Sequence, residues 1–310
     1  MKSVAGAPLI TVGITCFNAA NTISRAVLSA IRQDWPDKEI IVVDDSSNDE
    51  SVAVVEELCT QFPEVRLIRH ERNRGYAGSL NTIIKEAKGE FIAIFDDDDE
   101  SVPRRLRAQW SRITSYERAQ KCKLILCYAN RKVIKSGQSS PDHVANAIGR
   151  QSPEPHGIAV ADYLFGCAYD RRFVWGMFGS CTLMARRETL VAIGGFDETF
   201  RRCAEWDMAI HAAFRGAHFI AVDEPLISQY KTGGADKSGI IPLIYSIRLR
   251  QKHKDYLVKR RFYWASLAMA RSNFHGNKGR LLKSRAYAFL AGLLSPAVLG
   301  QRIAGKLGGP

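Results

Sequence analysis

A short apolar run that ends in consecutive acids constrains this chain more than any other stretch. Residues 91–95 read Phe-Ile-Ala-Ile-Phe, and such a run after Gly89 is typical of a strand buried on both faces. The acids that follow are Asp96, Asp97, Asp98, Asp99 and Glu100. Five adjacent acids repel one another, and Mg²⁺ or Mn²⁺ with oxygen ligands would relieve that repulsion and suit a pyrophosphate. The alternative is a solvated acidic turn before a helix that starts at Pro103.

The aspartate run ends the last of four strands that alternate with helices. We expect strands at 9–15, 39–43, 65–68 and 91–95, helices at 19–33, 51–62 and 80–87, and a loop at 73–78. This α/β order predicts a mainly parallel sheet with helices on both faces. Polar residues follow three of the strands, at 15–18, 44–47 and 96–99. Because ligands bind beyond the carboxyl ends of such strands, the three clusters predict one ligand-binding crevice.

The second half of the chain contains shorter expected elements. They are a helix at 103–121, strands at 124–128, 132–134, 182–185 and 219–222, a mobile loop at 136–155, and helices at 187–193 and 206–215. The polar, glycine-rich segment 229–238 could close over a bound diphosphate through Lys231 or Lys237. A plain linker is the alternative for that segment.

The positive charge of the chain is concentrated near its end. The formal charge is +12 over 310 residues, yet residues 241–310 alone contain 14 Lys/Arg and one acid. We therefore expect a domain at 1–240, with halves at about 8–103 and 104–240, and a basic helical C-terminal extension at 241–310.

The basic extension suits an anionic partner. Phe289, Leu290, Leu293 and Leu294 have helical apolar spacing, which favours the plane of an anionic membrane surface. A helix packed on the body, with its basic side solvated, is the alternative. Nucleic acid is not an expected partner, because no recognised nucleic-acid-binding module accompanies the charge.

The cysteines and the apolar segments indicate a cytoplasmic protein. Seven dispersed cysteines without metal-ligand spacing are typical of small core residues in a reducing compartment. The N-terminus has no apolar secretion signal, and no run reaches the roughly 18 apolar residues of a spanning helix. We expect a cytoplasmic location, with peripheral contact to the inner face of the plasma membrane through the extension.

Several motifs together resemble a known family. They are Thr15-Cys-Phe-Asn18, Val43-Asp-Asp-Ser-Ser-Asn-Asp49, Gly89-Glu-Phe-Ile92, Phe95-Asp-Asp-Asp-Asp99 with Pro103, Ile193-Gly-Gly-Phe-Asp-Glu198 and Ala204-Glu-Trp-Asp-Met208. In this order, over residues 8–232, the chain resembles family 2 glycosyltransferases, which are inverting enzymes with the GT-A fold, a Rossmann-like mixed sheet. The resemblance implies transfer of a sugar from a nucleotide-diphosphate sugar, with UDP as the expected nucleotide, to a saccharide or lipid-linked saccharide in surface polysaccharide or glycolipid synthesis.

The resemblance also implies roles for individual residues. The Asp-x-Asp element of the family falls on Asp96, Asp97 and Asp98, with Asp98 as a ligand of Mn²⁺ or Mg²⁺ and Asp96 facing the ribose or the metal. The residues implied to bind the nucleotide are Thr15, Phe17, Asn18, Asp44, Asp45, Arg74, Gly75, Asp96 and Asp97. An aromatic ring can stack on the base, a carboxylate can accept hydrogen bonds from its ring N–H groups, and a cation can balance the charge of the pyrophosphate.

The catalytic base is expected in the second half, because inversion needs one carboxylate to accept the proton of the attacking hydroxyl. Ala204-Glu-Trp-Asp-Met208 departs from the family pattern Glu-Asp-x-Asp-Leu and leaves Glu205 or Asp207 as candidate base. Either carboxylate could instead cap its helix. Trp175 and Trp206 could stack on acceptor sugar rings, and core packing is the alternative.

Two other functions remain open from the sequence. A sugar nucleotidyltransferase would require a glycine-rich phosphate-binding loop with a basic residue after the first strand. This chain has Thr15-Cys-Phe-Asn18 there, which does not match. A catalytically inactive, membrane-associated nucleotide-sugar-binding protein would explain the departure at Ala204-Glu205. Release of nucleoside diphosphate in the presence of an acceptor separates the enzyme from this second alternative.

Overall fold

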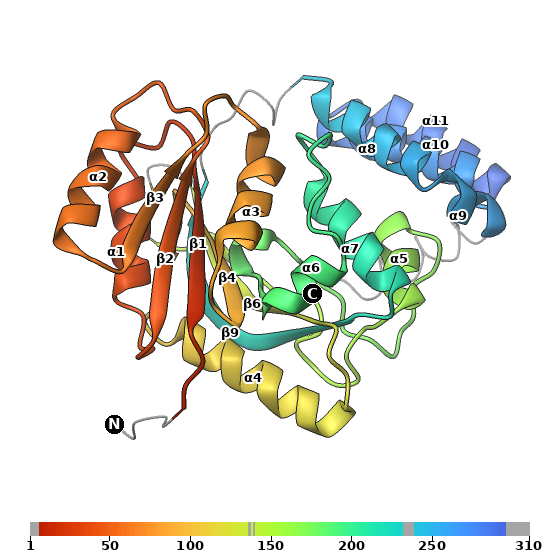
Figure 1. Ribbon diagram of the computed structural model, residues 1–310. Helices are drawn as coiled ribbons and strands as arrows, with labels where there is room; N and C mark the ends of the chain where they lie inside the picture. The colour runs from red at the N-terminus through yellow and green to blue at the C-terminus, as the bar shows by residue number, and fades with distance from the viewer. Residues whose placement is uncertain (1–5, 136–137, 139, 232–238, 296–310) are drawn as a thin grey trace.

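The computed structural model describes residues 6–135, 138, 140–231 and 239–295. Within these residues nine strands form one mixed sheet. The strands are β1 Ile10–Cys16, β2 Lys38–Asp44, β3 Val65–Arg69, β4 Phe91–Asp96, β5 Glu100–Ser101, β6 Ile125–Ile134, β7 His143–Ala145, β8 Met184–Arg186 and β9 His218–Tyr230. Their order is β3-β2-β1-β4-β8-β6-β9-β5, with β7 paired to β6 (Figure 1).

The predicted parallel half of the sheet is confirmed. β1 pairs in parallel with β2 and β4, and β2 pairs in parallel with β3. β8 runs antiparallel between β4 and β6, and β6 and β9 are again parallel. In the register, Thr15 stands opposite Val43 on one side and Asp96 on the other. The three polar strand ends therefore lie at the same edge of the sheet.

Helices cover both faces, as predicted, because the central strands are predominantly apolar and buried, and successive side chains point to opposite faces of the sheet. In β4, Phe91, Ala93 and Phe95 pack with one core, whereas Ile92 and Ile94 pack with the other. The first core lies under α1 Ile23–Ile31, α2 Ser51–Gln61 and α4 Arg105–Gln120. The second core lies under α3 Gly75–Glu86, α5 Ile158–Phe165, α6 Arg187–Ala192, α7 Ala204–Phe214 and the short 3-10 helix η1 Ser180–Thr182.

The expected loop at 73–78 is wrong. Helix α3 begins at Gly75, five residues before the predicted start. Asp45, which follows β2, accepts hydrogen bonds from the backbone N–H groups of Arg74 and Gly75, at 2.8 and 2.7 Å. These bonds satisfy two backbone N–H groups at the helix N-terminus, and their acceptor lies in a segment distant in the sequence. The local sequence therefore gave no cap signal.

Three strand predictions in the second half have the wrong bounds. The strands expected at 124–128 and 132–134 are the single strand β6. The strand expected at 219–222 is the first part of β9, which continues to Tyr230 and pairs it with Ile134. A register shift between β6 and β9 accommodates polar Asn130, and such bulges keep strands paired where the local pattern suggests a break. Strand β7 also lies inside the expected loop at 136–155.

The C-terminal extension is helical, as predicted. Its helices are α8 Ile241–Lys252, α9 Lys254–Lys259, α10 Tyr263–Asn277 and α11 Leu281–Leu294 (Figure 1). Leu249, Leu257 and Phe262 are buried in the same core as α5 and α7. A continuous core therefore crosses the predicted boundary at 240/241. The division into two domains remains a prediction. Among the described residues, no helix is long and apolar enough to cross a membrane.

Candidate active site

The aspartates after β4 carry more negative charge than their surroundings neutralise. Burial, together with the neighbouring carboxylates, raises the pKa of Asp96 to about 6 and the pKa of Asp99 to about 8. Burial also raises the pKa of Asp97 to about 7. Asp99 Oδ1 accepts a hydrogen bond from the Tyr230 N–H at 3.2 Å, whereas Asp99 Oδ2 is buried without a partner. A bound cation would relieve both the charge and this unsatisfied oxygen.

Asp96, Asp99 and Cys181 could hold such a cation. One donor atom from each lies within 4.8 Å of the other two. Two carboxylates suit Mn²⁺ or Mg²⁺, which prefer oxygen ligands. The assignment of Asp98 as a metal ligand stays a prediction; its backbone carbonyl accepts a hydrogen bond from Arg25. Sequence reasoning placed Asp99 in the acidic run but assigned the metal to Asp96 and Asp98, and it missed Cys181, which η1 brings beside the turn after β4.

The loops after β1 and β2 are locked to each other and to the aspartates. The Asn18 N–H donates to Ser47 Oγ at 2.9 Å, and Asn18 Oδ1 accepts from the Asn48 N–H at 2.8 Å. The Phe17 N–H donates to Asp97 Oδ2 at 3.0 Å, while the Phe17 ring remains 47% exposed. An exposed ring held by rigid loops is available for stacking. The structure thus brings Thr15, Phe17, Asn18 and Asp97 together, as expected.

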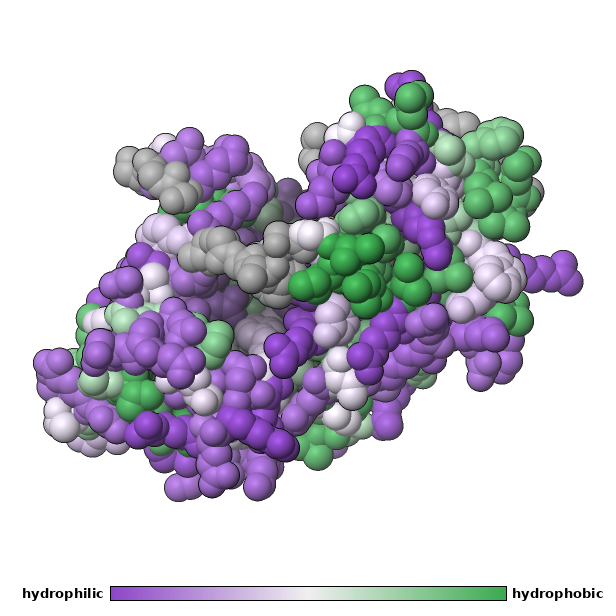
Figure 2. Space-filling view, turned by 90° about the horizontal axis from the view of Figure 1, so that it is seen from above, coloured by the Kyte–Doolittle hydropathy of each residue, from purple (hydrophilic) through white to green (hydrophobic). Residues whose placement is uncertain are grey.

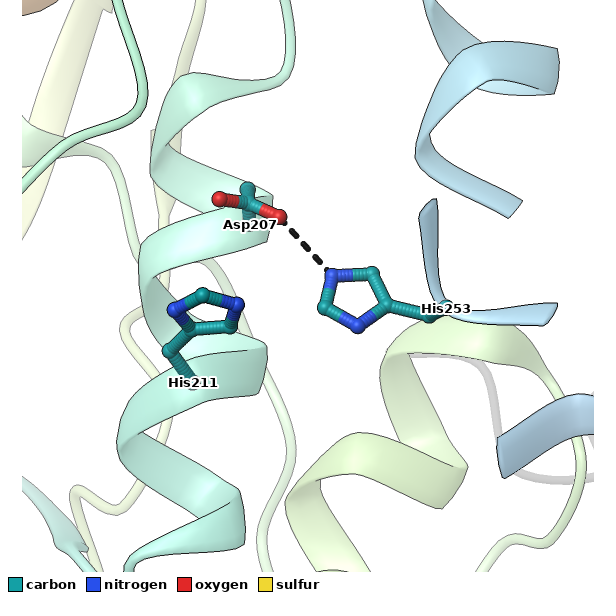
Figure 3. A group of neighbouring side chains, drawn as sticks. All are labelled: Asp207, His211 and His253. Atoms are coloured by element: carbon teal, nitrogen blue, oxygen red, sulfur yellow. Dashed lines mark hydrogen bonds and ion pairs between the residues drawn. The ribbon is translucent and has the colours of Figure 1, made fainter. Parts of the chain in front are cut away.

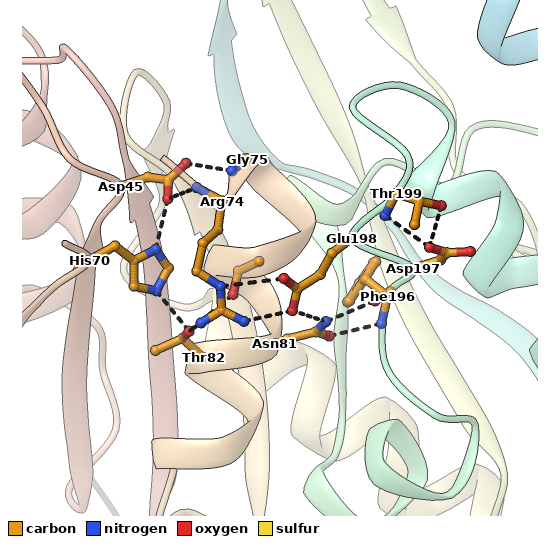
Figure 4. A network of polar contacts seen from close by, with 11 residues as sticks. Asp45, His70, Arg74, Gly75, Asn81, Thr82, Phe196, Asp197, Glu198 and Thr199 are labelled. Carbon is orange, nitrogen blue, oxygen red and sulfur yellow. Dashed lines mark hydrogen bonds and ion pairs between the residues drawn. The ribbon is translucent and has the colours of Figure 1, made fainter. Parts of the chain in front are cut away.

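The adjacent carboxylates Asp44 and Asp45 are used differently. Asp45 binds the start of α3, and its Oδ1 also lies 2.7 Å from His70 Nδ1 (Figure 4). Asp44 Oδ2 accepts from the Ser47 N–H at 3.1 Å, but Asp44 Oδ1 is buried without a partner. Of the two residues expected to contact the base, Asp44 therefore offers an unused oxygen, whereas Asp45 positions the helix.

Arg74 was expected near the nucleotide as a cation, and its guanidinium is engaged elsewhere. It forms two hydrogen bonds to Glu198, with Nη2–Oε1 at 2.7 Å and Nε–Oε2 at 3.3 Å. Asn81 joins the same carboxylate (Figure 4). The Gly-Gly-Phe-Asp-Glu motif therefore meets the start of α3.

Arg131, from β6, lies close enough to Asp96 and Asp99 to oppose the pKa increase caused by burial. Arg131 was missed by sequence reasoning, because it fell in the expected gap between the strands at 124–128 and 132–134 and belongs to no motif.

A chain of hydrogen bonds joins the aspartates to Glu205. Tyr76 Oη donates to Asp96 Oδ1 at 2.8 Å and lies 2.6 Å from Ser180 Oγ. The Ser180 N–H donates to Glu205 Oε1 at 2.7 Å, and Ser180 Oγ donates to the same oxygen. Glu205 lies in the first turn of α7. The candidate base and the candidate metal ligand therefore belong to one polar network, and Tyr76 and Ser180 are members that no sequence motif indicated.

Asp207 lies in a different environment from Glu205. Its Oδ1 is 2.8 Å from His253 Nε2 and its Oδ2 is 2.7 Å from Lys252 Nζ, so both oxygens bind the junction of α8 and α9 (Figure 3). Burial acts to raise the pKa of Asp207, but these hydrogen bonds outweigh burial and lower it. Asp207 is 2% exposed. We interpret it as a residue that attaches the extension to α7.

Asp207, His211 and His253 also place one donor atom each within 4.8 Å of one another (Figure 3). Such a set resembles a zinc site. The ammonium group of Lys252 already neutralises this carboxylate, however, and would repel a second cation. We therefore assign the group an ion-pair role.

The two candidate acceptor tryptophans differ in exposure. Trp175 is 8% exposed, stacks on Tyr163 with ring centroids 4.1 Å apart, and donates from Nε1 to the Asp170 carbonyl at 2.9 Å. Trp206 is 40% exposed and meets Phe178 edge to face. Core packing explains Trp175, whereas Trp206, beside Glu205 in the sequence, remains exposed to solvent.

Relatives with known names share this sequence pattern. Residues 11–154 match the family model Glycosyl transferase family 2. The chain is 43% identical over 100 residues to "Succinoglycan biosynthesis protein ExoO" of Rhizobium meliloti, covering 32% of this chain and 28% of that protein. It is 25% identical to "Amylovoran biosynthesis glycosyltransferase AmsB" of Erwinia amylovora, covering 82% and 75%. It is 30% identical to "UDP-Glc:alpha-D-GlcNAc-diphosphoundecaprenol beta-1,3-glucosyltransferase WfgD" of Escherichia coli, covering 41% and 47%. The chain thus spans less than half of ExoO and of WfgD, and three quarters of AmsB.

Solved structures share the fold. S. aureus TarS 1-349, in complex with UDP-GlcNAc, superposes with a TM-score of 0.63 at 17% identity, covering 93% of this chain and 81% of that one. "Mannosyltransferase PcManGT" from Pyrobaculum calidifontis, in complex with GDP-Man and Mn2+, gives 0.57 at 17% identity, covering 97% and 80%. The fold is thus similar to GT-A glycosyltransferase structures. The family model over residues 11–154, the relatives and the fold agree, and together they support a family 2 glycosyltransferase.

Proposed function

We propose that the chain transfers a sugar from a nucleotide-diphosphate sugar to a saccharide hydroxyl with inversion at the anomeric carbon. The observation that carries this proposal is the single polar network that joins the aspartates after β4 to Glu205 through Tyr76 and Ser180. One end of the network has the acids that suit a diphosphate-bound cation. The other end has a carboxylate suited to accept a proton.

The donor would lie over the carboxyl ends of β1, β2 and β4. Asp44 Oδ1 would accept a hydrogen bond from the base, and the exposed Phe17 ring would stack on it. UDP is the nucleotide we propose, since TarS is described with UDP-GlcNAc and WfgD is named for UDP-Glc. Mn²⁺ or Mg²⁺, held by Asp96 with Asp98 or Asp99, would neutralise charge on the departing diphosphate.

Glu205 is the base in this proposal. The acceptor oxygen forms a bond to the anomeric carbon while the bond from that carbon to the diphosphate oxygen breaks. The electron pair leaves with the nucleoside diphosphate, and the hydroxyl proton passes to Glu205. Ser180 holds Oε1 through two hydrogen bonds, which leaves Oε2 to accept the proton. Asp207, with both oxygens bound to Lys252 and His253, is not the base in this proposal.

The acceptor we propose is a saccharide or lipid-linked saccharide in surface polysaccharide or glycolipid synthesis. Relatives carry the names of succinoglycan and amylovoran synthesis, and WfgD is named for a diphosphoundecaprenol acceptor. We propose that the chain acts from the cytoplasmic side, with Trp206 against the acceptor sugar.

The Glu205→Gln variant tests the proposal, because Gln keeps the size and the Ser180 hydrogen bonds but cannot accept the proton. Release of nucleoside diphosphate with an acceptor should fall by about a hundredfold to ten-thousandfold. Donor binding, followed by titration calorimetry over a panel of nucleotide sugars with Mn²⁺, should be unchanged. Equal loss of binding and turnover would contradict the assigned role. A wild-type protein that binds donors but releases no product with any acceptor would favour the inactive binding protein.

A further inference from the structure

The hairpin of α10 and α11 turns its largest apolar side chains outward. Helix α11 packs on α10 through small groups, since Ala291 and Gly292 are buried and Ser272 Oγ donates to the Ser284 carbonyl at 2.8 Å. The exposed side chains of α11 are Leu281 at 61%, Leu282 at 84%, Phe289 at 67%, Leu290 at 43%, Leu293 at 67% and Leu294 at 45%. A helix stabilised only by the core would show the opposite arrangement.

These side chains form a stripe with cations on both sides. Leu282, Phe289 and Leu293 recur at i, i+7 and i+11, so they share one face of the helix. At 100° per residue, Lys283 and Arg285 fall on opposite flanks of that stripe. Neither α10 nor α11 contains Asp or Glu. An apolar stripe between cations, without acids, is the pattern of a helix that lies in an anionic membrane surface.

Other helices of the extension carry further exposed apolar side chains. Trp264, 66% exposed, lies in the first turn of α10, at the end of the hairpin where α11 finishes. Ile240 and Ile244, 57% and 51% exposed, lie at the start of α8. Figure 2 looks down on the edge where β1, β2 and β4 end and shows apolar surface gathered over the tail helices. Contact through this surface would turn the mouth of the crevice toward the surface it binds.

A hollow beside the stripe has the chemistry of a lipid headgroup site. Its volume is about 380 Å³, and it is lined by His275, Lys283, Ala286, Tyr287 and Leu290. His275 Nδ1 is buried without a partner, and the His275 ring stacks on Tyr287. The Lys283 ammonium group beside the exposed Leu290 suits a phosphate attached to an acyl chain.

We propose that the apolar stripe of α11, with Trp264 and the flanking Lys283 and Arg285, docks on an anionic phospholipid bilayer. The docking would bring the crevice to a lipid-linked acceptor, and only this consequence rests on the proposed function. Binding to lipid itself requires no transfer reaction. The charge complements an anionic lipid surface, because neither helix carries an acid that such a surface would repel.

Sedimentation of the full chain with vesicles tests the docking. Vesicles of phosphatidylcholine mixed with phosphatidylglycerol should carry the protein down, and pure phosphatidylcholine should carry down far less. Phe289→Ser with Leu293→Ser should lower the partition coefficient by about tenfold or more, because two large side chains no longer enter the bilayer. Lys283→Gln with Arg285→Gln should weaken the preference for anionic lipid and its salt dependence.

Matched variants keep the test falsifiable. Val191→Ser, an exposed apolar position on α6, and Lys85→Gln with Lys88→Gln, exposed cations of the sheet domain, should bind vesicles like the wild type. Unchanged binding by the α11 variants, or no sedimentation of the wild type, would overturn the proposal. A dimer in solution that Phe289→Ser with Leu293→Ser makes monomeric, with vesicle binding unchanged, would assign the stripe to a second copy instead. Turnover on a soluble acceptor reports separately on the proposed function.

Discussion

The acids after β4 and the acid in α7 that faces the extension are both largely buried, yet their surroundings have opposite effects. Burial raises the pKa of Asp96 and Asp99, and one oxygen of Asp99 has no partner. The pKa of Asp207 is lowered, because His253 and Lys252 donate to both of its oxygens. We interpret a buried carboxylate without compensating partners as a candidate ligand-binding group, and a compensated one as a contact that holds two segments together. On this basis we propose a functional role for Asp96 and Asp99 and a structural role for Asp207.

The largest expected effect is on catalysis. Asp96→Asn should lower kcat/KM by about a thousandfold, because the charge stabilisation supplied by a metal is worth several kcal/mol. The melting temperature of the metal-free variant should be unchanged or higher, since one repelling charge is removed. Transfer kinetics and calorimetric titration with Mn²⁺ check this. Parallel measurements on Asp98→Asn and Asp99→Asn decide which of these two acids accompanies Asp96, and a weakly affected Asp98 variant would contradict the role implied by the resemblance.

The corresponding change at Asp207 should affect stability. Asp207→Asn breaks a buried pair and should lower the free energy of unfolding by about 3 kcal/mol. Asp170→Asn is the matched control, because its partner Arg172 is exposed and such surface pairs contribute little to stability. Urea denaturation measures both. A folded Asp207→Asn protein without turnover would contradict the distinction drawn between the two regions.

The adjacent acids Asp44 and Asp45 sharpen the same distinction. Asp44→Asn should weaken UDP binding by about tenfold or more, because the unpartnered oxygen is the one proposed to meet the base. Asp45→Asn should instead destabilise the start of α3 by about 1 kcal/mol. Titration calorimetry and thermal unfolding separate the two outcomes, and the reverse pattern would exchange the two roles.

The smallest effect is on the pH dependence of stability. The pKa of Asp99 is about 8 in the folded chain, above its ordinary value of 3.8, so the folded state binds the proton more tightly than the unfolded state. Stability of the metal-free protein should therefore fall as the pH rises from about 4 to 8. Asp99→Asn should flatten this dependence, raising the melting temperature at pH 8 by about 5 °C relative to wild type. If the stability of the two proteins depended on pH with equal slopes, the charge of Asp99 would be neutralised by its neighbours in the folded chain.

The strands that carry the site could be predicted because their signals are local. The apolar runs of β1, β2 and β4 end at polar residues, and parallel pairing brings those ends together. The start of α3 could not be predicted, because its cap is Asp45, thirty residues earlier. The unity of β6 and the length of β9 also depend on their mutual pairing, which no local pattern records.

By itself the sequence determined the mixed α/β sheet, the acidic strand end, the family motifs and the basic helical tail. Only the tertiary structure decided which acid serves which purpose. It placed Glu205 in hydrogen-bond contact with Ser180 and turned Asp207 toward His253, although the two acids are two positions apart on α7. Residues two apart on a helix point to different sides, so the neighbours contributed by η1 and α8, and not the motif, decide what each carboxylate can do.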